Sequence, residues 1–297
     1  MFIDCHTHVS VLPRTRKGKL LGAFLLPEEL IEVYDRVGIE QGAMLPIVSP
    51  EGSDTSQSNY EVIEAAARFP GRLIPFCNID PRQSTNTADK NLSEVIVHFK
   101  DLGCRGIGEI TANLPFDDPR VVNLFNHAEK CGMPVTFHVA HRDGNTYGLI
   151  DELGLPRFEK QVQLHPNLVF LCHSQTFWSH ISADVNAQNW AGYPKGPVAP
   201  DGRIPSLMRK YPNVYGDLSA GSGHNAVSRD PEFGYAFLTE FQDRLLFGTD
   251  VNQVEHGKSV LILLKDFLVE ALAKGKISQE VFDKVTHKNA QRVFRLI

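Results

Sequence analysis

The stretch MFIDCHTH at residues 1–8 decides how the rest of the chain is interpreted. Its first five residues are mostly apolar, which is typical of a buried strand. His6 and His8 follow directly, and residues two apart on an extended backbone point to the same face. Both imidazoles can therefore reach one point, and two neutral imidazoles at a strand end form half of a metal site. The alternative is that the two histidines only end the strand and face solvent.

Composition limits the classes of protein to which the chain can belong. With 297 residues, of which 42% are hydrophobic, it can bury one large core. No apolar run reaches the roughly 18 residues of a membrane helix, and acidic and histidine residues interrupt the first ten positions. We therefore expect neither a membrane span nor a signal peptide. The net charge of −5 argues against general binding to nucleic acid. Five dispersed cysteines without a CxxC pair favour a reduced, cytoplasmic setting.

Strand-like and helix-like segments alternate along the chain. This alternation predicts βαβ units around a parallel sheet, and eight strands are the number that closes a (β/α)8, or TIM, barrel of the α/β class. The expected strands are residues 1–5, 42–47, 73–79, 104–110, 134–139, 168–172, 214–218 and 244–248. The expected helices are residues 28–37, 59–69, 91–102, 120–130, 232–241, 258–272 and 278–296.

The connections between these segments fall into two kinds. Those from helix to strand are short and contain Gly or Pro, which end helices. Those from strand to helix are long and polar, and in such barrels they form the face that carries the chemistry. The segment 178–205 is the longest and is the candidate lid. The last expected helix, 278–296, closes the barrel, so residues 1–297 are predicted to form one barrel domain of the metal-dependent hydrolase type.

Residues of metal-binding type stand at the expected carboxyl ends of five strands. A parallel barrel brings these ends to one rim, so we expect the side chains to converge. The mixture of imidazole and carboxylate suits a catalytic divalent ion, Zn²⁺ first and Mn²⁺ second, with one coordination position open. Any single member could instead only cap its strand. The set consists of His6, His8, Glu109, His138, His173 and Asp250.

Four motifs together resemble the amidohydrolase superfamily, in the branch that includes aminocarboxymuconate semialdehyde decarboxylase and related aromatic-acid decarboxylases. The motifs are DCHTH, FHVAH, FLCHSQ and LLFGTD, and the resemblance covers essentially the whole chain. It implies four metal ligands, namely His6, His8, His138 and Asp250. It also implies that His173 stands close by and handles a proton. Glu109 departs from the decarboxylase pattern and resembles the strand-four acid of TatD-like hydrolases, which helps to hold a second metal. The number of ions, one or two, is therefore open.

The same residues can serve two reactions. A divalent ion lowers the pKa of its bound water from about 15.7 toward 7. Asp250 can ligate the ion and shuttle a proton, and an unligated His173 suits general acid–base catalysis. Because of Glu109 we favour a metal-dependent hydrolase of a small ester, lactone or amide of an organic acid. The alternative is a non-oxidative decarboxylase of an aromatic or unsaturated carboxylic acid. A non-catalytic metal-binding protein and a nuclease fit less well, because the ligand set is intact and no basic stripe is present.

Three further residues on the same rim are candidate substrate contacts. Arg142 could clamp a substrate carboxylate, Trp178 could cover a substrate ring from the candidate lid, and His224 lies in a glycine-rich loop. The competing interpretations are an exposed loop arginine and a tryptophan that packs beneath the lid. We expect a small anionic substrate as the partner, with no nucleic acid or membrane, and the sequence leaves a homodimer open.

Overall fold

Eight parallel strands form the centre of the molecule. The structure is a computed structural model that describes residues 1–12, 15–16, 19–20, 24–83, 85–253 and 262–296. Each of the eight strands expected from the sequence is present in this part of the chain. The strands are β1 Ile3–Thr7, β4 Gln41–Met44, β5 Leu73–Pro75, β6 Ile107–Ile110, β7 Val135–Ala140, β9 Phe170–His173, β10 Val214–Asp217 and β11 Leu245–Leu246.

These strands close into a barrel. Two runs of hydrogen-bonded neighbours have the orders β1-β4-β5 and β11-β10-β9-β7-β6. A parallel bridge from Cys77 to Ile107 joins β5 to β6, and a second from Thr7 to Val251 joins β1 to the chain after β11. In addition, the amide of Cys5 donates to the carbonyl of Phe247 at 2.9 Å. Every seam is thus parallel, and the prediction of a (β/α)8 barrel is confirmed.

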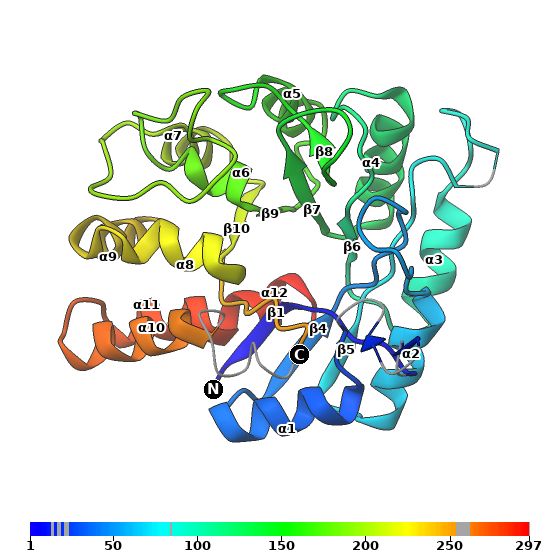
Figure 1. The fold of residues 1–297 in the computed structure, drawn as a ribbon, viewed down its shortest axis with the longest axis horizontal. Coiled ribbons are helices and arrows are strands. Elements are labelled where there is room, and N and C mark those ends of the chain that lie inside the picture. The colour runs from blue at the N-terminus through cyan, green and yellow to red at the C-terminus, as the bar shows by residue number, and fades with distance from the viewer. Residues whose placement is uncertain (13–14, 17–18, 21–23, 84, 254–261, 297) are drawn as a thin grey trace.

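Helices surround the strands, as Figure 1 shows. The helices over the outer face are α1 Pro27–Val37, α2 Asn59–Arg68, α3 Ser93–Asp101, α4 Pro119–Cys131, α5 Pro156–Leu164, α7 Arg203–Lys210, α9 Pro231–Glu240 and α10 Leu263–Ala273. Ser58 and Glu61 form a capping box at the start of α2, and Gly38 and Gly132 end α1 and α4 in the left-handed conformation that glycine adopts without strain. Of the expected helix 258–272, residues 258–261 lie outside the described residues, and α10 covers the rest from Leu263.

Two connections expected as loops contain further helices. α6 (Gln175–Ser179) follows β9, and α8 (Ala220–Ser228) follows β10. The glycines of α8 lower its helix propensity, which hid it in the sequence, but they allow close packing. A Cβ on Gly223 would come within 2.2 Å of the Leu218 carbonyl oxygen. The candidate lid 178–205 therefore begins in α6 and ends in α7, and only the part between these helices is irregular.

The amino-terminal end of the barrel is closed by the last helical segment. This segment runs through α11 Gln279–Asp283, the π-helical turn η3 Lys284–Lys288 and α12 Asn289–Val293. Ser278 accepts a hydrogen bond from the Val281 amide, so the start expected at Ser278 is confirmed. Phe294 packs edge-to-face on Phe76 at 5.1 Å between ring centroids inside the barrel. Burial of such a side chain stabilises the fold by roughly 1.5–3 kcal/mol.

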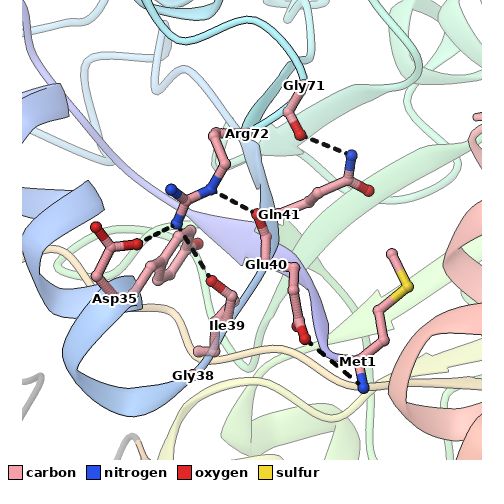
Figure 2. Close-up of a pocket in the computed structure, with 9 residues that line it drawn as sticks. Met1, Asp35, Gly38, Ile39, Glu40, Gln41, Gly71 and Arg72 are labelled. Atoms are coloured by element: carbon pink, nitrogen blue, oxygen red, sulfur yellow. Dashed lines mark hydrogen bonds and ion pairs between the residues drawn. The ribbon is translucent and has the colours of Figure 1, made fainter.

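Charged groups hold the start of the chain at this same end. The amino group of Met1 lies 3.7 Å from Glu40, and Arg72 forms an ion pair with Asp35 at 2.6 Å (Figure 2). The hollow that these residues line is at the opposite end of β1 from His6 and His8, and its charges are paired with one another. No helix in the part of the chain that the structure describes is long and apolar enough to cross a membrane.

Candidate metal centre

His6 and His8 turn the same ring nitrogen toward each other at the end of β1. Their Nε2 atoms are 3.2 Å apart. The Nδ1 of His6 lies 2.6 Å from Oδ2 of Asp217, and the Nδ1 of His8 lies 2.6 Å from the Leu45 carbonyl oxygen. Because both Nδ1 atoms face acceptors, they carry the protons, and the Nε2 lone pairs are left to face the centre. A tetrahedral Zn²⁺ holds two imidazole nitrogens roughly 3.3 Å apart, so this pair fits such an ion.

Two carboxylates complete this half of the centre. Oε2 of Glu109 lies 3.6 Å from the Nε2 atoms of both His6 and His8. Oδ1 of Asp250 lies 3.4 Å from the Nε2 of His8 and 3.9 Å from that of His6. Glu109 is 4% exposed and comes from β6, whereas Asp250 follows β11. Two imidazoles and two carboxylates from three separate strands therefore converge on one buried point.

His138 and His173 border the same point from β7 and β9. The Nδ1 of His138 lies 3.0 Å from Oε1 of Glu109, and the Nε2 of His173 lies 3.8 Å from the same oxygen. The ring centroids of His6 and His173 are 4.4 Å apart. The donor atoms form two groups of three that lie close enough to hold an ion, namely His6, His8 and Asp250, and His6, Glu109 and His173. The structure thus brings together all six residues that the sequence places at the carboxyl ends of the expected strands.

The electrostatics of this cluster favour anionic carboxylates. Burial raises the pKa of Glu109, but its hydrogen bonds to His138 and His6 outweigh burial and hold the pKa well below its usual range. Burial also raises the pKa of Asp250, but its hydrogen bond to His8 outweighs burial, so that the pKa is lowered. Burial lowers the pKa of His173 to about 4. His173 is therefore neutral near pH 7, as a proton acceptor must be.

Asp217 is a functional residue that the sequence reasoning missed. Its carboxylate accepts from His6, from the Ser219 amide at 2.9 Å and from the Cys5 thiol at 3.2 Å, and Oδ2 is 3.6 Å from the Nδ1 of His173. Ser219 Oγ in turn lies 2.9 Å from that Nδ1. Asp217 thus orients two of the histidines. The signal was present, because Asp217 is the polar residue at the end of the seventh expected strand.

Asp4 is a second missed residue, and it ties the first strand to the last. Its buried carboxylate accepts hydrogen bonds from Tyr34, from the amide of His6 at 3.0 Å and from the amide of Thr249 at 2.8 Å. The Asp250 amide donates to the His6 carbonyl at 2.8 Å. Asp250 adopts a left-handed backbone with φ 58°, which Asp tolerates better than most residues. These contacts fix the relative position of His6 and Asp250.

A small cavity opens directly over the cluster. The ring of Tyr147 packs against His138 at 4.3 Å between centroids, and the ring of Phe24 lies 5.7 Å from that of His8. Aromatic faces therefore flank the histidines on two sides. The lining residues are His8, Phe24, Ile47, Gly52, Glu109, Thr111, His138, Tyr147, His173, Asp250 and Asn252.

The three residues expected to contact substrate are not among the described residues that line this cavity. Trp178 is 2% exposed, and its indole N–H donates to the Asp217 carbonyl at 2.9 Å, so it packs in the core instead of covering a ring. Arg142 is exposed and donates to the Asn145 carbonyl at 3.1 Å. His224 is half-buried in α8, 6.4 Å from the ring of Phe267. The placements of Arg142 and Trp178 fit the competing interpretations, an exposed loop arginine and a packed tryptophan.

A barrel with imidazoles and carboxylates on its carboxyl-terminal rim defines a class of metal-dependent enzymes. The chain belongs to the amidohydrolase family, because the family model described as Amidohydrolase matches residues 3–296. This confirms the resemblance that the four motifs carry. No curated protein sequence matches the chain.

Solved structures share the fold at low sequence identity. An uncharacterized TIM-barrel protein from Bordetella bronchiseptica is 19% identical over 99% of this chain and 98% of its own, with a TM-score of 0.64. A probable 2-pyrone-4,6-dicarboxylic acid hydrolase from Acinetobacter baumannii is 14% identical over 99% of both chains, with a TM-score of 0.60. The 5-carboxyvanillate decarboxylase from Novosphingobium aromaticivorans, with bound manganese, is 14% identical over 99% and 97%, with a TM-score of 0.62.

Proposed function

We propose that the protein is a metal-dependent hydrolase that acts on a small ester, lactone or amide of an organic acid. The observation that carries the proposal is the position of Glu109. Its Oε2 is equally far, 3.6 Å, from the Nε2 atoms of His6 and His8, and its Oε1 faces His138. A carboxylate between these three imidazoles would help to hold a second ion, and two ions are expected of a hydrolase of this kind.

The residues that would hold the metal are His6, His8, Glu109, His138 and Asp250, and His173 is kept for proton transfer. This donor set fits Zn²⁺ first and Mn²⁺ second. When bound, such an ion polarises a carbonyl group and lowers the pKa of water. The related decarboxylase that contains manganese supports a divalent metal in this fold.

Asp250 and His173 would move the protons of the reaction. Asp250 is anionic because its pKa is lowered, so its free oxygen accepts the proton of the attacking water as the water oxygen adds to the carbonyl carbon. His173 is neutral and is held through Nδ1 by Ser219, so its Nε2 faces the reacting groups. Collapse of the tetrahedral adduct breaks the bond from the carbonyl carbon to the leaving oxygen or nitrogen. The leaving atom takes up the proton that Asp250 accepted from the water.

A decarboxylase of an aromatic or unsaturated acid is the second candidate. One contact favours it, because Oε1 of Glu109 lies 3.0 Å from the Nδ1 of His138 and so already has a partner within the protein. If Glu109 is engaged in this way and does not ligate, the remaining donors would hold a single ion. The likeness to a pyrone hydrolase and to carboxyvanillate and dihydroxybenzoate decarboxylases supports a small carboxylic acid as the substrate in either case. One domain over residues 1–297, a cytoplasmic location and a homodimer stay predictions.

Product analysis together with a metal count tests the proposal. Protein reconstituted with Zn²⁺ or Mn²⁺ is incubated with 2-pyrone-4,6-dicarboxylate, simple lactones and 5-carboxyvanillate, while acid release and carbon dioxide are followed. We expect acid release without carbon dioxide, two ions per chain in the wild type and one in Glu109→Gln. Arg142→Gln serves as the control, because Arg142 lies outside the cavity. Carbon dioxide release with one ion in both proteins would instead establish the decarboxylase.

A further inference from the structure

Two buried polar groups on the wall of the cavity have no partner among the residues that the structure describes. They are Oγ1 of Thr111 and Oδ1 of Asn252. Thr111 is 1% exposed. Buried polar groups are usually paired, so groups that are unpaired beside a cavity point to a ligand that pairs with them.

The backbone holds Thr111, Tyr147 and Asn252 in place. The Thr111 carbonyl accepts from the amide of Gly148 at 2.8 Å, which ties Thr111 to the segment that carries Tyr147. Gly148 has φ 106°, and a Cβ there would come within 2.6 Å of the His138 carbonyl oxygen. The Asn252 carbonyl accepts from the Leu25 amide at 2.8 Å. Their side chains are therefore positioned by main-chain contacts, which leave the polar atoms free for a ligand.

The chemistry of these atoms defines what they can bind. Oδ1 of Asn252 only accepts hydrogen bonds, so its partner must donate one, whereas the Thr111 hydroxyl can do either. The aromatic side chains of Tyr147 and Phe24 also line the cavity. A planar skeleton with a hydroxyl or amino substituent matches both features.

We propose that Thr111, Tyr147 and Asn252 form the specificity subsite of the metal centre and take a planar substrate that carries a hydrogen-bond donor. This inference rests on the proposed function, because the reacting group of the substrate must lie on the metal side of the cavity. The subsite selects the substrate, whereas His173 and Asp250 act on it. Loss of a subsite residue should therefore change substrate preference more than metal binding.

Matched pairs of small acids test the subsite in the metal-loaded protein. The probes are 2-, 3- and 4-hydroxybenzoate and their three methyl ethers, with dissociation constants from calorimetry. We expect at least one hydroxybenzoate to bind about tenfold more tightly than its ether, since the ether cannot donate to Asn252. Thr111→Val and Asn252→Leu should each reduce this ratio about three- to tenfold. Tyr147→Phe should keep most of the affinity for every probe, and Tyr147→Ala should weaken all of them.

Thr136→Val is the matched control. Thr136 is equally buried and its Oγ1 is also unpaired, but it does not line the cavity. We expect it to keep the wild-type ratio. Equal binding of hydroxybenzoates and ethers to the wild type, or an unchanged ratio in both Thr111→Val and Asn252→Leu, would overturn the subsite. If no probe binds although the metal content is full, the subsite is overturned, whereas the proposed function is decided separately by acid release and the metal count. A lost ratio with unchanged metal content supports the subsite whichever reaction is found.

Discussion

Nδ1 of His6 and Oδ2 of Asp217 lie 2.6 Å apart, and both groups are fully buried. This contact joins the first strand of the barrel to the seventh. It places the proton of His6 on Nδ1 and directs Nε2 at the metal centre. A carboxylate that stands behind a ligand also raises the basicity of that ligand. Asp217 is therefore as much a part of the centre as the residues that would touch the ion.

The first prediction concerns metal affinity in Asp217→Asn. The amide keeps the shape of the side chain but removes the charge that orients His6. We expect the affinity for Zn²⁺ to fall about 10- to 100-fold, the usual effect of such outer contacts. Competition with a chromophoric chelator measures it. Asp151→Asn is the control, since Asp151 is equally buried but caps α5 through the amides of Arg157 and Phe158. Equal losses in both variants would contradict the role of Asp217.

The second prediction separates proton transfer from ligation at His173. We expect His173→Asn to retain its metal, because His6, His8, Asp250 and a carboxylate oxygen already supply four donors. Turnover should fall roughly 10²- to 10⁴-fold, the share of a positioned acid–base group. Elemental analysis measures the metal content, and steady-state rates measure the turnover. Loss of one ion per chain would make His173 a ligand and assign proton transfer to Asp250 alone.

The third prediction follows from the burial of Trp178. Trp178→Phe removes the donor to the Asp217 carbonyl, so the free energy of unfolding should fall by roughly 1–3 kcal/mol. Probe binding at the metal centre should change little. Trp190→Phe is the matched control, because the indole N–H of Trp190 has no partner in the described part of the chain, and its effect should stay within about 0.5 kcal/mol. If Trp178→Phe keeps its stability but no longer binds the probes, Trp178 covers a substrate ring after all.

The fourth prediction concerns stability against pH and uses His180. Burial lowers its pKa to about 4, with Nδ1 donating to Thr176 and Nε2 accepting from Gly154. Between pH 6.5 and 4 the unfolded chain binds a proton at this residue that the folded chain does not. Stability should therefore fall as the pH falls through this window, by about 1.4 kcal/mol per pH unit.

Denaturant titrations of the wild type and His180→Gln across this window provide the measurement. The difference between the two proteins isolates His180, because Asp4 and Asp151, whose pKa values burial raises to about 6, act in the opposite sense in both. Their carboxyl groups are protonated in the folded state first, so they favour folding as the pH falls. A pH-independent difference would show that His180 is not buried as a neutral group.

The residues of the metal centre were predictable because parallel strands impose a simple rule. A strand end can be located from apolar runs, and all such ends meet at one rim, so Glu109 and Asp250 could be paired although they are far apart in sequence. Asp217 obeys the same rule, since it stands at the end of the seventh expected strand. The substrate residues were not predictable in this way. Whether Arg142 turns inward depends on a loop conformation that no local pattern fixes.

Helices that depend on tertiary packing could not be predicted from the sequence either. α8 contains Gly221 and Gly223, and its sequence alone favours a loop. Gly223 allows a close approach to the Leu218 carbonyl oxygen, which a Cβ would prevent. Trp178 was misplaced for the same reason, since its partner Asp217 lies 39 residues away in the chain. Tertiary contacts of this kind decide what single-sequence periodicity leaves open.

The bonds from Asp4 to Thr249 have a consequence for synthesis on the ribosome. They span 245 positions in the sequence, so β1 has no partner on one side until the chain beyond β11 has emerged. His6 and His8 are translated before every other residue of the centre, and Asp250 is translated last of them. A nascent chain therefore carries an unpaired strand edge and half a metal centre until Asp250 has emerged, and any truncation before residue 250 leaves both exposed.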